Sequence, residues 1–234
     1  EYIKTYGAKR SPDLYLDSQV KIADITYGNG KKKEAYLKYA GVIDSYRNLV
    51  KQKTKIGSTG LGAAAKSGFY VLEPKYDDYN AIKLDNKKTL SANIKKRLTL
   101  IKPLRDSYEK VVLDYKHGEW AVAALYQIGK MSDDFVLAIK SSPIPEELKT
   151  DAQKELYQYE IGEQFRPVEE AALEYYAKCV RTSAEYRIYN DFTEKSIKSL
   201  ERLRPSQFVA DLEFRAKPGS NSNIFESSPI IEVK

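Results

Sequence analysis

The spacing of apolar residues between positions 89 and 205 restricts this chain to a helical fold more strongly than any other feature. Apolar side chains there recur every three or four residues, which places them on one stripe of a helix. Two stripes have this spacing: Leu98, Ile101, Leu104 and Tyr108, then Trp120, Ala124, Ile128, Met131, Phe135 and Ala138. The break at His117 and Gly118 lies between them. The pattern therefore predicts two helices joined by a short turn.

Prolines and polar residues mark the helices that follow. Pro145 suits the first turn of a helix, where its missing N–H costs nothing, so we expect a long helix to begin there and to run toward residue 182. Pro167 should kink this helix, because its ring clashes with the preceding turn. Asp191 can cap a last helix, which Pro205 closes.

The first 88 residues carry weaker signals. A helix is predicted for residues 31–52, and the stretch before it can form another helix that Gly28 and Gly30 end. Residues 69–73, "FYVLE", can form a short strand or an extended loop.

The chain divides into three parts. Residues 1–88 form an N-terminal helical part, residues 89–205 the helical region, and residues 206–234 an extended tail rich in turn-forming residues. A chain of 234 residues is long enough for one sizeable core, so we expect the parts to belong to one structural unit.

The segment "GSTGLGAAAKSG", residues 57–68, is close to a phosphate-binding loop. Reading from Gly60, the spacing to Lys66 and Ser67 fits that pattern, but Ala65 stands where a glycine is required. The preceding stretch is too polar for a central strand, and Pro74 would end a following helix early. We therefore expect a mobile Gly/Ala/Ser insertion between helices rather than a nucleotide site.

Charge and composition exclude several classes of function. The 39 basic and 33 acidic residues give a net charge of +6 but are mostly interleaved, as on solvated helix faces, so no nucleic-acid partner is expected. No apolar run is long enough to span a membrane. One histidine, His117, and one cysteine, Cys179, are too few for a metal site or a Ser/His/Asp centre. No metal, cofactor or catalytic residue is predicted.

Paired carboxylates and tyrosines are both expected to have structural roles. Neighbours such as Asp133 and Asp134 diverge by about 100° on a helix, so we expect a solvated surface there rather than a shared site. Most of the 19 tyrosines should be wedges in the core, whereas those off the apolar stripes, such as Tyr126, can line a groove.

An internal similarity points to helical repeats. Tyr39, Tyr108 and Tyr176 are each followed by apolar residues three and four positions later, and they lie 69 and 68 residues apart. These separations are about twice the 34-residue period of a tetratricopeptide repeat.

Residues 89–208 resemble a known family in the runs "GEWAVAALYQIGKMSDDF" and "EEAALEYYAKCVRTSAEYRIYNDFTEKSIKSLERLRP". The family is that of tetratricopeptide-repeat proteins from the cell envelope of gliding and predatory proteobacteria, which includes lipoproteins of gliding-motility complexes. The positions that match the repeat pattern are Leu125, Ile128, Gly129, Ala171, Tyr175, Lys178, Phe192 and Pro205.

The resemblance implies an all-α, right-handed helical solenoid. The helix expected after Pro145 is longer than the repeat norm, so this solenoid would have elongated helices. It implies a non-catalytic scaffold or adaptor in a periplasmic or envelope-associated assembly, whose partners are other envelope proteins or peptides. The partner segment would lie in a groove formed by the first helix of each repeat. The groove-facing candidates that the resemblance provides are Tyr126, Lys130, Asp133, Asn190, Thr193 and Ile197.

A second hypothesis belongs to another class of function. A polysaccharide- or peptidoglycan-binding envelope protein would stack tyrosines on sugars, and paired glutamates would perform acid/base work. Hydrolysis would require two carboxylates that face each other across about 5 to 10 Å in a cleft.

Overall fold

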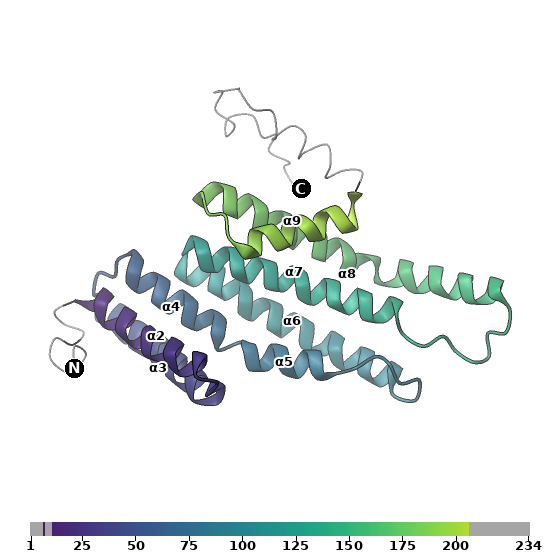
Figure 1. The fold of residues 1–234 in the computed structure, drawn as a ribbon, viewed down its shortest axis with the longest axis horizontal. Coiled ribbons are helices and arrows are strands. Elements are labelled where there is room, and N and C mark those ends of the chain that lie inside the picture. Colours follow the sequence, from purple (N-terminus) through teal and green to yellow (C-terminus); the bar gives the residue numbers. More distant parts are fainter. Residues whose placement is uncertain (1–6, 8–10, 206–234) are drawn as a thin grey trace, which may run out of the picture.

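The computed structural model describes residue 7 and residues 11–205, and these residues contain helices and no strand (Figure 1). The all-α prediction is therefore confirmed for the described part, and the predicted tail over residues 206–234 lies outside it. The helices are α2 (Pro12–Gly28), α3 (Lys32–Lys51), α4 (Ser58–Tyr70), α5 (Glu73–Ala81), α6 (Leu90–Tyr115), α7 (Gly118–Lys140), α8 (Asp151–Tyr186) and α9 (Asp191–Leu203).

The helices form two layers that alternate along the chain (Figure 1). In the first, which we call layer A, α2 contacts α4, α4 contacts α7, and α7 contacts α9. Helix α5 follows α4 in this layer. It packs on α6, and the phenol of Tyr79 donates a hydrogen bond to the Met131 carbonyl of α7. The second, layer B, consists of α3, α6 and α8, each of which packs on the layer A helices before and after it in the chain.

Helix α7 is the centre of the fold. It contacts α4 and α9 in its own layer and α6 and α8 in the other. A helix that is apolar on most sides must be buried on most sides, and α7 is the most apolar long helix of the chain. Its side chains with no exposed surface are Val122, Ala123, Ala124, Ile128, Met131 and Phe135.

The prediction of a mobile insertion over residues 57–68 is wrong, because this segment begins helix α4. Its alanines and glycines allow neighbouring helices to approach closely: a Cβ on Gly68 would lie 2.8 Å from the ring of Tyr115. Ala64 and Ala65 have no exposed surface, since α4 packs against α2, α3, α6 and α7. Burial on several sides thus offsets the low helix propensity of glycine.

The predicted helix over residues 31–52 is confirmed as α3, and the helix before it ends at Gly28 as expected. The turn between α6 and α7 lies at the predicted break, with Lys116 in the left-handed conformation at φ 49°. Other boundaries are wrong in three places. Residues 69–73 form no strand, because Phe69 and Tyr70 complete α4. Helix α8 begins six residues after Pro145, where Thr150 and Gln153 form a capping box.

The third wrong boundary is the cap of α9. Asn190 caps the helix in place of Asp191. Its side-chain oxygen accepts hydrogen bonds from the backbone N–H groups of Phe192 and Thr193.

Candidate functional site

A polar hollow of about 450 Å³ lies across α2, α4 and the start of α7. It forms because α2 and α7 both pack on α4 but hardly contact each other, while the α4 residues between them are too small to fill the space. A volume of this size suits a small ligand or a few residues of a peptide. The side chains that determine its chemistry are Asp17, Lys21, Asp24, Lys66, His117, Glu119 and Trp120, above a floor that includes Gly62 and Ala63.

A glycine at the floor of the hollow lets the imidazole of His117 lie against α4. A Cβ on Gly62 would lie 2.8 Å from Nε2 of His117, so a larger residue would displace the imidazole from this position. The imidazole and the indole of Trp120, three residues later, then form the wall of the hollow on the side of α7.

Both lysines of the hollow are paired with carboxylates. Lys66 Nζ lies 2.6 Å from Asp24 Oδ2, and Lys21 Nζ lies 2.7 Å from Asp17. Tyr39 donates a hydrogen bond of 2.6 Å to the other oxygen of Asp24. Burial and this carboxylate raise the pKa of Tyr39, so the phenol stays protonated and remains a donor.

Glu119 carries the unpaired negative charge of the hollow. It is exposed, and no hydrogen bond or ion pair of its carboxylate is found within the described residues. Trp120 beside it is half-buried, and Lys66 Nζ lies 5.7 Å from the centroid of its ring. The hollow therefore combines two neutralised ion pairs, one free carboxylate and an aromatic surface.

The structure also explains why the segment at 57–68 is no phosphate loop. The carboxylate of Asp13 accepts hydrogen bonds from the backbone N–H groups of Gly57 at 3.1 Å and Gly60 at 2.8 Å. A carboxylate of the protein thus occupies amides that a phosphate loop would offer to a nucleotide. The lysine of the motif, Lys66, is engaged by Asp24.

Burial of His117 predicts a dependence of stability on pH. Its Nδ1 is buried with no hydrogen-bond partner in the described part of the chain. Burial lowers its pKa, and the nearby charge of Glu119 opposes this shift. The unfolded state therefore takes up a proton near pH 6.5, before the folded state does, so stability present above about pH 6.5 is lost as the pH falls. Urea unfolding midpoints from about pH 7.5 to about pH 5 should fall in the wild type.

The variant His117→Gln is the control for this effect. It removes the titrating group while keeping a side chain of similar polarity, so its midpoint should depend less on pH over the same range. An equal slope in both proteins would show that other groups cause the pH dependence.

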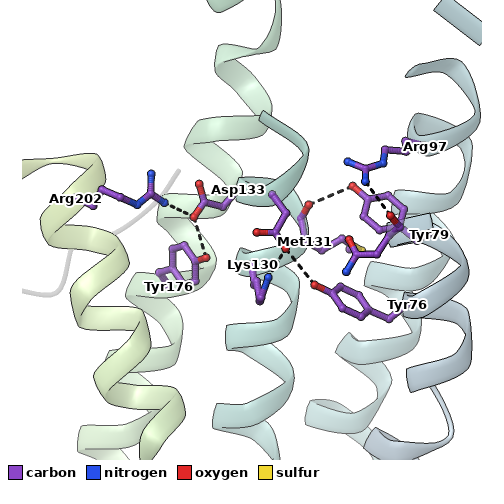
Figure 2. Close-up of polar contacts among 10 residues, drawn as sticks. Tyr76, Tyr79, Arg97, Lys130, Met131, Asp133, Tyr176 and Arg202 are labelled. Atoms are coloured by element: carbon purple, nitrogen blue, oxygen red, sulfur yellow. Dashed lines mark hydrogen bonds and ion pairs between the residues drawn. The ribbon is translucent and has the colours of Figure 1, made fainter. Parts of the chain in front are cut away.

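Two of the predicted site residues, Lys130 and Asp133, lie in a polar cluster on α7 that is separate from the hollow (Figure 2). Asp133 is 6 % exposed, accepts a hydrogen bond of 3.1 Å from the Tyr176 phenol of α8, and pairs with Arg202 of α9. Lys130 pairs with Asp134, which also accepts a hydrogen bond of 3.1 Å from the phenol of Tyr76 in α5.

The two adjacent carboxylates thus point to different neighbours, as predicted, but the expected solvated surface is wrong for Asp133. Asp133 joins α7 to α8 and α9, whereas Asp134 joins α7 to α5. Asp133 is buried because Tyr176 and Arg202 supply the donors that a carboxylate needs away from water.

The other predicted site residues lie where α7, α8 and α9 meet. Tyr126 is half-buried, and its ring centroid lies 5.9 Å from that of Tyr176 and 5.6 Å from that of Phe192. Asn190 caps α9, and Ile197 packs in the cluster of buried residues between α8 and α9. Thr193 is 2 % exposed and donates a hydrogen bond of 2.9 Å to the hydroxyl of Ser183.

A groove-facing position is therefore wrong for two of the six predicted residues, Asp133 and Thr193. Both side chains are buried and satisfied by partners within the protein. The sequence pattern does not reveal the hollow, because its floor has the composition of a flexible loop. The available signal was the occurrence of the only histidine and the only tryptophan, His117 and Trp120, within one helical turn.

Fold and site together define an all-α protein of two helical layers with a polar hollow on its surface. No protein-family model, no curated protein and no solved structure matches the chain. Among residues 7 and 11–205, no helix has both the length and the apolar character needed to cross a membrane.

Proposed function

We propose that this protein is a non-catalytic scaffold that holds a segment of a partner protein in the hollow formed by α2, α4 and α7. The hollow itself carries this proposal, because three helices of layer A contribute to it and leave it open to solvent. An extended segment that follows it would cross the helices, as partner segments do on helical-repeat surfaces.

The alternation of the layers supports a tetratricopeptide-like arrangement. In this reading α2, α4, α7 and α9 are the first helices of successive units, and α3, α6 and α8 are the second helices. Most contacts between units then join neighbours, as in a helical repeat, although Phe69 of α4 also meets Phe192 of α9. The lengths of α6 and α8, 26 and 36 residues, make the units longer than the usual repeat, and the additional helix α5 lengthens the second unit further. In this reading these additions give the repeated tyrosines their wide spacing.

The chemistry of the hollow favours binding over catalysis. Asp24 is held by both Lys66 and Tyr39, so neither its carboxylate nor the lysine is free for proton transfer. The one thiol, Cys179, is fully buried, and burial raises its pKa to about 11, so it is a poor nucleophile at neutral pH. The envelope assembly proposed for the partner rests on the resemblance of residues 89–208.

Filling the hollow should prevent capture of the partner. Thr59 is exposed and lines the hollow, so Thr59→Trp places a large side chain in it without disturbing buried contacts. We expect pull-downs from the source organism to lose specific envelope proteins with this variant, at an unchanged melting temperature. Quantitative mass spectrometry of the captured proteins measures the loss.

The matched control is Thr99→Trp. Thr99 is exposed on α6 of layer B, so the same substitution leaves the hollow open. Identical captured proteins for wild type, Thr59→Trp and Thr99→Trp would contradict the proposal.

The sugar-binding alternative has one supporting observation. Trp120 shares the hollow with the carboxylates of Asp17 and Glu119. The indole can stack on a sugar ring, and the carboxylates can accept hydrogen bonds from its hydroxyl groups. Titration of the protein with soluble peptidoglycan fragments, measured by isothermal titration calorimetry, tests it. Saturable binding that Thr59→Trp removes would favour this alternative over a protein partner.

A further inference from the structure

The charges of the protein are distributed unequally between the two layers. In layer A, helices α2, α4, α5, α7 and α9 contain twelve carboxylates and eight basic residues, an excess of four negative charges. In layer B, helices α3, α6 and α8 contain thirteen carboxylates and fifteen basic residues, an excess of two positive charges. The chain as a whole has a net charge of +6, so the layer that forms the hollow has the opposite sign to the protein.

We propose that the hollow binds a basic segment, with a lysine or arginine side chain directed to Glu119 and Trp120. This inference rests on the proposed function, because it assigns the chemistry of the partner segment for the same site. The hollow contains three carboxylates, Asp17, Asp24 and Glu119, but only two lysines.

Pairing inside the hollow leaves a negative charge in one place. Asp17 pairs with Lys21, and Asp24 pairs with Lys66. Each of these ion pairs has no net charge. The remaining carboxylate, that of Glu119, is exposed and finds no partner within residues 11–205. A cation from a partner would form an ion pair with this carboxylate.

The aromatic surface beside Glu119 suits the same occupant. A guanidinium or ammonium group is attracted to the face of an indole within about 6 Å of the ring centroid. Lys66 already lies 5.7 Å from the ring centroid of Trp120, so this ring takes part in a cation–π contact in the free protein. An arginine would also form paired hydrogen bonds to the carboxylate of Glu119, which favours it over lysine.

An acidic segment is disfavoured at this site. It would bring negative charge toward Glu119, and both lysines that could attract it are already paired. The amides of Gly57 and Gly60 cannot attract it either, since they donate to Asp13.

The test uses two short fluorescent peptides that differ only in having arginine or glutamate at alternate positions. Anisotropy titrations at low salt should show binding of the arginine peptide and not of the glutamate peptide, with affinity that falls as salt is added. Glu119→Gln should weaken binding by about twofold to fivefold, as expected for the loss of one exposed ion pair. Thr59→Trp should abolish binding.

Glu160→Gln is the matched control, because Glu160 is exposed on α8, away from the hollow. It removes the same charge and should leave the affinity unchanged. Equal losses for Glu119→Gln and Glu160→Gln would overturn the inference, because attraction by overall charge would then explain the binding.

Tighter binding of the glutamate peptide, or binding of neither peptide, also overturns the basic assignment. The proposed function is judged separately by the pull-down with Thr59→Trp. A partner lost from that pull-down in the absence of arginine-peptide binding would sustain the scaffold and reject only its basic segment.

Discussion

Replacing Phe135 by alanine is expected to lower the free energy of unfolding by about 3 to 5 kcal/mol, which is a large part of the stability of a typical domain. Phe135 has no exposed surface in α7. Its ring meets that of Phe165 of α8 edge to face, with centroids 5.5 Å apart. The substitution removes this contact and leaves a cavity where α8 packs on α7. Urea unfolding followed by far-UV circular dichroism measures the change.

Leu137→Ala is the control on the same helix. Leu137 is 43 % exposed, so its truncation removes little buried surface and should cost about 1 kcal/mol or less. Similar losses for Phe135→Ala and Leu137→Ala would contradict the central position of α7.

The second large effect is expected from Gly129→Leu in α7. A Cβ at this position would lie 2.8 Å from Cδ1 of Tyr176, a fully buried ring of α8. The leucine therefore forces α7 and α8 apart or displaces Tyr176 from its hydrogen bond to Asp133, at a cost of about 1 to 3 kcal/mol or more. Thermal unfolding should show a lower melting temperature.

Gly41→Leu provides the matched comparison. Nothing lies within 4 Å of a Cβ at Gly41, which is exposed on α3. Leucine has a higher helix propensity than glycine, so this variant should gain a few tenths of a kcal/mol, up to about 0.8. A destabilisation of the same size at both positions would show that the close approach of α7 and α8 is not the cause.

These two predictions also bear on the proposed scaffold. Both concern the packing of α7 on α8, which positions the start of α7 beside α4. The hollow depends on that position, because its wall contains His117, Glu119 and Trp120 at the end of α7 that contacts α4. Loss of partner capture in Phe135→Ala would therefore follow from lost stability, whereas loss in Thr59→Trp would follow from the filled hollow.

Local signals in the sequence were sufficient for much of the fold. The stripes with Leu104 and Ile128 predicted α6 and α7, since the side chains that recur at helical spacing are those that a helix buries. The turn at His117 was predicted because both stripes stop there. The sequence did not determine which residue caps α9. Asn190 and Asp191 are both good capping residues, and the backbone conformation decides between them.

Helix α4 shows why local signals fail for small residues. Its glycines and alanines have no side-chain periodicity that identifies a buried face, and their composition is also that of a flexible linker. The helix is stabilised by contacts from elsewhere: Asp13 caps it from 47 residues away, and four other helices cover it.

The sequence alone determined that this chain is helical and where most of its long helices lie, because helix periodicity is set by residues three and four positions apart. Only the tertiary structure decided that residues 58–70 form a helix, that Asp133 is buried, and that the hollow lies across α2, α4 and α7. These features depend on groups far apart in the chain, such as Gly62 against His117 and Lys66 against Asp24. Whether such groups meet is a property of how the helices pack, which the local pattern of residues does not contain.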